Sequence, residues 1–290
     1  MMKNTILQIS LLMNVLVCST PDVASINLKN AILSPDWLDY GDFQGNPAFV
    51  KKNLMLITIE RHHVYADDLD LEIVDQLGVV ADNIIFLSKH KSASEKKALT
   101  VHPIGNWGKA DLGGKDGELT PAAPHLMSAL LRTMKKTAAH LADYDIVFEV
   151  THHGPLLATP TLFLEIGSTE AEWTNPAAAS AWAEALFSVV EERNHPIAVG
   201  VGGGHYAPRF SETALSKKLD FGHMIPNYAI NFDDVAALAA SISKAMEASN
   251  TDQVFVHRKS MKKEQAAVVM EAIALAGGAA LDSSSLELLD

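Results

Sequence analysis

Short apolar runs alternate with longer amphipathic stretches along most of the chain. The apolar runs have strand length and are rich in Val, Ile, Leu and Phe, which is typical of buried β-strands. We expect strands at residues 14–18, 54–59, 84–88, 145–150, 162–166 and 196–201, near residue 228, and at 253–257. Between them, apolar positions recur at helical spacing, and we expect helices at residues 24–32, from 70, and at 124–141, 175–193, 233–248 and 260–276. This order predicts an α/β fold with a mainly parallel sheet flanked by helices.

Two stretches rich in Gly and Pro interrupt this pattern, and we expect both to be loops. They are residues 35–47 and 102–124, and the second contains five glycines and three prolines. Loops of that length inside a compact domain are usually functional. Residues 13–278 are expected to form a single α/β catalytic domain or two closely packed lobes, followed by a frayed tail at 279–290.

The first twelve residues are interpreted as an N-terminal extension, with Met13 as an alternative start. Lys3 and the apolar stretch at 6–17 faintly resemble a signal peptide, but Gln8, Ser10 and Asn14 interrupt the stretch. It is also too short to span a bilayer as a helix. We therefore expect a first β-strand there and no membrane segment.

The single cysteine, Cys18, excludes an intrachain disulfide and a zinc site built from several cysteines. It is expected to be a buried structural thiol in a protein of the cytoplasm. Any metal must then be held by histidine, carboxylate and water.

The formal net charge of −12 counts against nonspecific nucleic-acid binding, because phosphate contacts need Lys and Arg. Basic residues nevertheless gather in three clusters: Lys89, Lys91, Lys96 and Lys97; Arg132, Lys135 and Lys136; and Arg258, Lys259, Lys262 and Lys263. Each cluster is either part of a basic face or an ordinary solvated helix face, and the sequence does not separate these two interpretations.

Five histidines stand beside Gly or Pro, several of them just after an apolar run. They are His102, His152, His153, His205 and His223. We expect them in turns past the carboxyl ends of strands, which is where open parallel α/β sheets bind ligands. If those strands are parallel neighbours, the five side chains meet in one cleft.

The densest motif is Glu149-Val-Thr151-His152-His153-Gly-Pro, at the end of a predicted strand. Strand alternation sends Glu149 and Thr151 to one face, and the Gly-Pro turn leaves the two histidines on the rim. Neutral imidazoles and a carboxylate are suitable zinc ligands. Adjacent histidines in a loop are more often polar turn residues, so the motif alone leaves both interpretations open.

A glycine-rich loop after the strand at 196–201 is the second motif, and it contains Gly202, Gly203, Gly204, His205, Tyr206 and Arg209. Glycine permits positive φ and close backbone approach, so these N–H groups can cradle a phosphate or an oxyanion. Arg209 can contact a phosphate or carboxylate through two N–H groups. The alternative is a tight turn between a strand and a helix.

The third motif, around His102, Asn106 and Trp107, lies in the long loop. An exposed tryptophan there can stack on a nucleobase, or it can pin the loop onto the core. His223 adds another imidazole, with Tyr228 five residues later. Three glutamates near another strand end include a candidate general base: Glu165, Glu170 and Glu172.

The remaining histidines have no such context and are expected to be surface or helix residues: His62, His63, His90, His125, His140, His195 and His257. The Gly-x-Ser-x-Gly pattern is absent, which disfavours a serine hydrolase with a nucleophile elbow.

Four of these motifs, in this order, resemble the archaeal and plant D-aminoacyl-tRNA deacylases. They are His102-Pro-x-Gly105-Asn106, Glu149-x-Thr151-His152-His153-Gly154-Pro155, Gly202-Gly203-Gly204-His205-Tyr206-Ala-Pro208-Arg209 and Gly222-His223. The opening at 15–22 and the segment 165–173 are similar as well. The resemblance therefore covers residues 13–278, nearly the whole chain.

This resemblance implies hydrolysis of the ester that joins a D-amino acid to the terminal ribose of tRNA. Activity on aldehyde-modified D-aminoacyl groups stays open. It also implies an α/β fold similar to peptidyl-tRNA hydrolases and nucleoside phosphorylases, Zn²⁺ as cofactor and the tRNA acceptor end as partner, and we favour a monomer. Two other classes stay open: a metal-dependent amidase or peptidase acting on a small substrate, and a noncatalytic tRNA-binding protein.

The resulting hypothesis assigns catalysis to Glu149, Thr151, His152, His153 and His205. Zinc would be held by some of His152, His153, His205 and Glu149 and would lower the pKa of its water to about 7. The N–H groups of residues 202–204 would stabilise the oxyanion. Substrate binding is assigned to His102, Asn106, Trp107, Gly202, Gly203, Gly204, Tyr206, Arg209 and His223.

Overall fold

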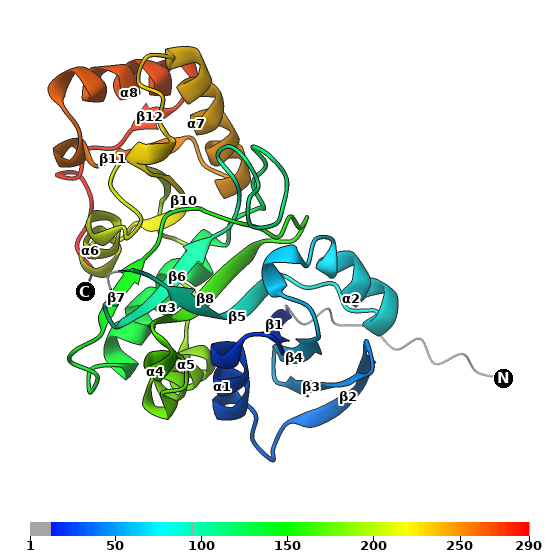
Figure 1. The fold of residues 1–290 in the computed structure, drawn as a ribbon. Helices are drawn as coiled ribbons and strands as arrows, with labels where there is room; N and C mark the ends of the chain where they lie inside the picture. Colours follow the sequence, from blue (N-terminus) through cyan, green and yellow to red (C-terminus); the bar gives the residue numbers. More distant parts are fainter. Residues whose placement is uncertain (1–12, 94, 290) are drawn as a thin grey trace.

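Residues 13–93 and 95–289 are described by a computed structural model, and the N-terminal extension expected at residues 1–12 lies outside them. The described strands are β1 (Asn14–Ser19), β2 (Leu38–Phe43), β3 (Asn46–Lys51), β4 (Leu54–Ile59), β5 (Asn83–Lys91), β6 (Ala98–Pro103), β7 (Asp145–Phe148), β8 (Thr161–Ser168), β9 (Ile197–Val201), β10 (Asp220–Ile225), β11 (Gln253–Val256) and β12 (Ala279–Ala280). They form two sheets (Figure 1). The larger has the order β2-β3-β4-β1-β5-β8-β6-β7 and the smaller the order β10-β9-β11-β12.

Most neighbouring strands run parallel. In the larger sheet β1 pairs in parallel with β4 and β5, β5 with β8, and β6 with β7. Every pairing in the described part of the smaller sheet is parallel as well. The predicted α/β fold with a mainly parallel sheet flanked by helices is confirmed, while the likeness to peptidyl-tRNA hydrolases and nucleoside phosphorylases stays a prediction.

The described helices are α1 (Val23–Ile32), α2 (Leu69–Leu77), α3 (Pro124–Thr137), α4 (Glu170–Trp173), α5 (Pro176–Ser188), α6 (Pro208–Ser216), α7 (Val235–Ser249) and α8 (Lys263–Leu275). Helices α1, α3 and α5 cover one face of the larger sheet, where they bury side chains such as Leu16 and Leu164. Helix α2 covers part of the opposite face, against Val17 and Phe86. None of the described helices has the length and apolar character needed to cross a membrane.

The two sheets share one apolar core through α3. That core joins Leu130 of α3 to Leu164 of the larger sheet and to Phe221 of the smaller sheet. Helices α7 and α8 cover the other face of the smaller sheet and lie together at one end of the molecule (Figure 1). Cys18 is completely buried in the shared core, as the sequence predicted.

The loop expected at residues 35–47 is instead largely the hairpin β2–β3. Its two-residue turn, Gln44-Gly45, has φ values of 55° and 80°. Two successive positive φ values match the twist of a tight hairpin and allow Phe43 to pair with Asn46. The high Gly and Pro content of this segment therefore marks a turn inside a hairpin, not an irregular loop.

Three expectations about the C-terminal third are wrong. The strand expected near residue 228 is β10, several residues earlier, and Tyr228 lies in a 3-10 turn at Asn227–Ala229. The last helix begins at Lys263, so Ser260 is not its cap. The tail is held by pairing, since β12 pairs with β11 and the N–H of Leu289 donates to Ser216.

Candidate active site

Polar side chains from three neighbouring strands of the larger sheet lie on the same face. Ser88 and His90 alternate onto that face of β5, and the register sets Ser88 opposite Glu165 of β8. Two residues before Glu165, Phe163 pairs with His102 of β6. This is the sheet face that α1, α3 and α5 leave uncovered.

The site does not lie at the carboxyl edge of the sheet, where the sequence placed it. Strand β6 runs antiparallel to β8, so the carboxyl ends of β5 and β8 lie away from those of β6 and β7. The histidines meet across the sheet face instead. His102 and His223 are strand residues of β6 and β10, not turn residues: His102 pairs with Phe163, and His223 lies at a bulge within β10.

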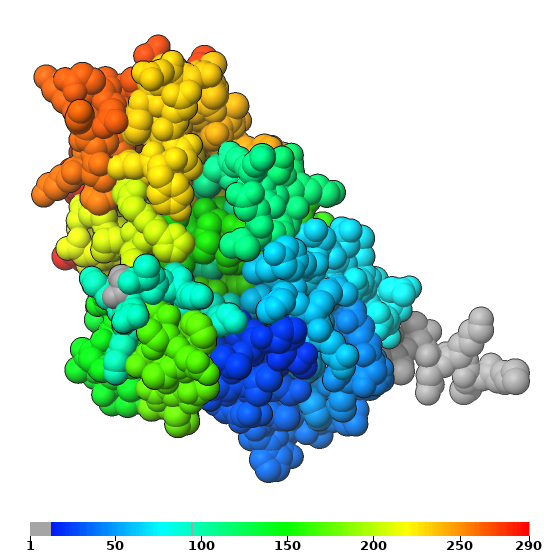
Figure 2. All heavy atoms as spheres, in the orientation of Figure 1, coloured from blue at the N-terminus to red at the C-terminus, as the bar shows by residue number. Residues whose placement is uncertain are grey.

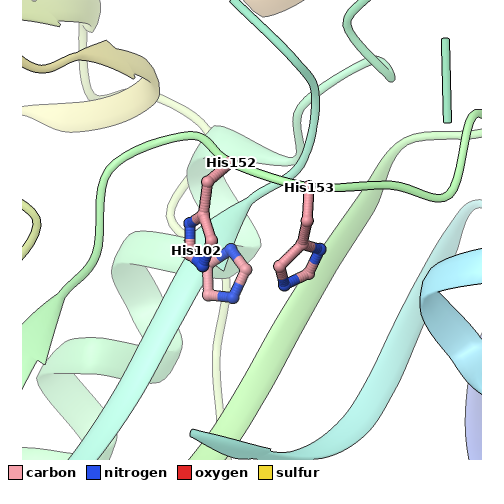
Figure 3. Close-up of side chains that lie close together, drawn as sticks. All are labelled: His102, His152 and His153. Atoms are coloured by element: carbon pink, nitrogen blue, oxygen red, sulfur yellow. The ribbon is translucent and has the colours of Figure 1, made fainter. Parts of the chain in front are cut away.

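His102, His152 and His153 form a compact group of three imidazoles above β6 (Figure 3). In each ring Nδ1 faces a backbone carbonyl: His102 that of Pro103 at 3.1 Å, His152 that of Val150 at 2.7 Å, and His153 that of Gly154 at 2.6 Å. An N–H that donates from Nδ1 leaves the lone pair on Nε2. Metal-bound histidines are oriented in this way.

Glu149 connects this group to two further histidines. Its Oε2 lies 2.9 Å from Nε2 of His205 and 3.6 Å from Nε2 of His152, and its Oε1 lies 3.1 Å from Nδ1 of His90. The carboxylate is completely buried. Burial alone would raise the pKa of Glu149, but His205 and His90 outweigh it and hold the pKa well below its usual value.

A second buried carboxylate, Glu165, lies beside the first. It accepts a hydrogen bond of 2.8 Å from Ser88, and its Oε2 is 3.5 Å from Nδ1 of His90 and 3.7 Å from Nε2 of His102. Burial would lower the pKa of His90, but Glu149 and Glu165 raise it to about 11. His90 is therefore an imidazolium between two carboxylates.

The three imidazoles differ in protonation. Burial, together with the charge of His102, lowers the pKa of His152 well below its usual value and that of His153 to about 3. Burial also acts to lower the pKa of His102, but Glu165 reverses this and raises it overall. The buried carboxylates thus favour a positive charge at His102, which a bound cation would supply in place of a proton.

Several polar atoms of the site have no hydrogen-bond partner among the described residues. They include Nε2 of His102 and the two carboxylate oxygens of Glu149, which lie at ion-pair distance from His205 and His90, 2.9 and 3.1 Å, without the geometry of a hydrogen bond. Buried polar atoms are normally satisfied, because leaving one unpaired is costly. Three overlapping groups could hold a metal ion: His102 with His152 and His153; His90 with Glu149 and His205; and His102 with Glu149 and Glu165. The unpaired atoms and these groups fit a metal centre.

The structure divides the zinc ligand set proposed from the sequence. His152 and His153 lie with His102, whereas Glu149 and His205 lie with His90. His90 was expected to be a surface or helix residue, and this is wrong, because it is buried in β5. Its neighbours in sequence are lysines, so only the pairing of β5 with β8 reveals its position.

Other expectations for lone histidines fail for the same reason. His63 is buried 3.3 Å from Asp22, and His195 is buried beside Asp220. His125 is a helix residue of α3, as expected, and its Nδ1 lies 2.6 Å from the same Asp220. His62 and His140 are exposed, as expected. Burying these imidazoles costs less free energy because each has a polar partner that is distant in the sequence.

The glycine-rich loop is largely occupied by its own contacts. The N–H of Gly202 donates to Ile225 at 2.8 Å, and the N–H of Gly203 donates to Ser260 Oγ at 2.9 Å. These two groups are therefore not available as oxyanion donors, contrary to the hypothesis drawn from the sequence. Tyr206 does reach the site, because its hydroxyl lies 2.9 Å from Nε2 of His90.

Four of the expected site residues lie behind the site and support it. Asn106 donates to the carbonyl of Gly113 at 2.9 Å, and Trp107 donates to the carbonyl of Thr151 at 3.1 Å, so this tryptophan pins its loop. Thr151 and His223 are completely buried and lie 3.1 Å apart through Oγ1 and Nδ1. Nε2–H of His223 donates to the carbonyl of Thr120 at 3.0 Å, which fixes the ring in its neutral form.

We expect His223 to make the protein less stable at mildly acidic pH. Burial lowers its pKa from 6.5 to about 4, so between these values the unfolded state binds more protons than the folded state. The free energy of unfolding should therefore fall as the pH drops through that window, by roughly 3 kcal/mol at most from this residue. Urea unfolding at several pH values should show a weaker pH dependence for His223→Asn. An unchanged pH dependence would contradict the assignment of this stability effect to His223.

Comparison with known proteins agrees with this arrangement. A family model described as D-aminoacyl-tRNA deacylase matches residues 77–279. The D-aminoacyl-tRNA deacylase of Methanosarcina mazei is 38% identical over 280 residues, which are 93% of this chain and 92% of that protein. The one from Methanococcoides burtonii is 39% identical over 272 residues, 91% of this chain, but the chain spans only about half of that protein's length, 55%.

A solved structure has the same fold. It is described as a conserved protein of unknown function, AF0625, and it superposes with a TM-score of 0.86 at 32% identity, over 96% of this chain and 99% of the other. The matched region of the family model contains every residue of the histidine and carboxylate site described above. From its sequence and its fold, the chain belongs to the D-aminoacyl-tRNA deacylase family.

Proposed function

We propose that this protein hydrolyses the ester bond of D-aminoacyl-tRNA and releases the free D-amino acid and tRNA. The observation that carries the proposal is the 38% identity to the Methanosarcina mazei deacylase over nearly the full length of both chains. A buried site with two carboxylates and several histidines supports it, because ester hydrolysis requires groups that activate water and stabilise developing charge. The cytoplasmic location expected from the single cysteine stays a prediction.

We further propose that the cofactor is zinc, held by Nε2 of His102, His152 and His153. These three side chains supply the nitrogen ligands of a catalytic zinc site and leave a position for water or substrate. Bound zinc would supply Lewis-acid polarisation and acidify a water molecule. The roles of the other site residues are then assigned from their contacts.

Glu149 is the residue best placed to take a proton from water. It is ionised, completely buried and within 3.6 Å of His152, so it faces the proposed zinc site from the side of His205. The imidazolium of His90 holds Glu149 and Glu165 in place on either side. Tyr206, in contact with His90, can orient the ribose end of the ester. Glu149 as a further metal ligand is the alternative, and a test is given in the Discussion.

The proposed reaction is tested by measuring release of tyrosine from D-Tyr-tRNA and from L-Tyr-tRNA, with and without a chelator. We expect fast release from the D-ester only, a loss of at least about tenfold with the chelator, and recovery on adding zinc. No release from either ester would contradict the proposal and leave a metal-dependent amidase of small substrates to be tested. D-selective release that resists the chelator would keep the reaction and exclude the zinc proposal.

A further inference from the structure

Two cavities beside the histidine and carboxylate site join into one groove. The first, of about 440 Å³, is lined by residues 202–204, Tyr206, Tyr228 and His257 among others. The second, of about 690 Å³, is lined by Phe255, Arg258 and Lys259 among others. Arg209 and His257 line both cavities. The groove therefore extends from Tyr206, whose hydroxyl contacts His90 of the site, to Arg258 and Lys259.

The inner cavity carries an exposed aromatic ring next to glycine backbone. Tyr228 is 65% exposed and lines this cavity. Opposite it, Gly202 and Gly203 have φ values of 111° and 89°, and a Cβ on Gly202 would lie 2.8 Å from Ser260 Oγ. Glycine thus keeps the wall of the cavity flat. Tyr206, in the same cavity, connects it to the site through its contact with His90.

The outer cavity is lined by three cationic side chains, Arg209, Arg258 and Lys259, and by the two carboxylates Glu212 and Asp282, of which Glu212 pairs with Arg209 at 3.0 Å. Arg258 and Lys259 are exposed and form no ion pair with any described carboxylate. Burial together with the charges of Arg209 and Lys259 lowers the pKa of His257, which lines both cavities. The yellow-green and orange parts of the surface adjoin in Figure 2.

Each of the other two basic clusters has a member that is already paired with carboxylates. Lys97 pairs with Asp143 at 2.8 Å and Glu172 at 3.3 Å. Arg132 is held 2.8 Å from the buried Asp220. Arg258 and Lys259, in contrast, line a cavity that adjoins the exposed ring of Tyr228 through the shared residues Arg209 and His257.

From these contacts we propose that the groove binds the 3′ end of the tRNA as a single strand. The terminal adenosine stacks on Tyr228 against the glycine backbone, and the preceding phosphates lie along Arg209, Arg258 and Lys259. An aromatic platform followed by a cationic track is how proteins hold single-stranded nucleic acid. The ester on the terminal ribose then faces Glu149 and His205. The inference rests on the proposed deacylase function, which supplies the identity of the ligand.

The test measures binding of uncharged tRNA, which does not depend on turnover. Tyr228→Ala should weaken binding by roughly 5- to 150-fold, and Tyr228→Phe should bind as the unaltered protein does. For tRNA that lacks the 3′-terminal adenosine, Tyr228→Ala should bind as tightly as the unaltered protein. Equal weakening for both tRNAs would overturn the stacking of that adenosine on Tyr228.

The charged part of the groove is tested by salt dependence. The double substitution R258Q/K259Q should weaken binding and reduce the slope of log Kd against log salt by about 1.4, the value for two phosphates of a single strand. The matched control K135Q/K136Q removes two charges from α3 and should leave both quantities unchanged. An equal effect of K135Q/K136Q would overturn the proposal that tRNA binds in the groove. Binding that follows these expectations without any deacylation would keep the groove and overturn the proposed function.

Discussion

We expect the substitution His152→Ala to lower the rate of D-aminoacyl-tRNA deacylation by roughly 10³-fold, because metal-ion catalysis contributes several kcal/mol to lowering the barrier. His152 contacts both halves of the site: it stacks on His102 with ring centroids 4.2 Å apart, and its Nε2 faces Glu149. Its removal therefore deletes one proposed zinc ligand and its contact with Glu149.

The measurement combines single-turnover deacylation with elemental analysis for zinc. Zinc content should fall together with activity, while the thermal unfolding transition of the zinc-free protein should be retained. His140→Ala is the matched control, since His140 is exposed and belongs to none of the three groups that could hold a metal ion. Full activity of the His152→Ala protein would remove this residue from the mechanism.

The second large effect is expected from Glu149→Gln. This substitution keeps the shape of the side chain and removes the only negative charge in direct contact with His205. As a proton acceptor, Glu149 should contribute about 10²- to 10⁴-fold to kcat, whereas binding of uncharged tRNA should not change. The exposed Glu170→Gln serves as the control.

Zinc content separates the two roles proposed for Glu149. If it acts as the base, the Glu149→Gln protein should retain zinc and lose turnover. If Glu149 is instead a ligand, the Glu149→Gln protein should lose zinc as well as turnover. The metal would then lie between the two histidine groups. Retention of both zinc and normal turnover would show that the buried charge of Glu149 is structural, serving to balance the imidazolium of His90.

The sequence alone determined the fold class and the part of the site that lies in the Glu149–His153 motif. The alternation of apolar strands and amphipathic helices is a local property, so β1, β4, β5, β8, β9 and β11 were found close to their observed positions. Local rules also found the Glu149–His153 motif, because strand alternation and a Gly-Pro turn act over a few residues. The cap of α5 by Asn175, which accepts from the N–H of Ala177 at 3.0 Å, is local in the same sense.

Only the tertiary structure decided which residues complete the site. His90 lies among lysines and does not resemble a site residue until β5 and β8 pair, and the same pairing singles out Glu165 from the three candidate glutamates. Because β6 runs antiparallel to β8, the site lies on the sheet face and not at the carboxyl edge that the sequence predicted. Whether Trp107 stacks on a base or pins its loop depended on one hydrogen bond to Thr151. These features depend on contacts between residues far apart in the chain, and their energies come from burial and pairing that no short segment contains.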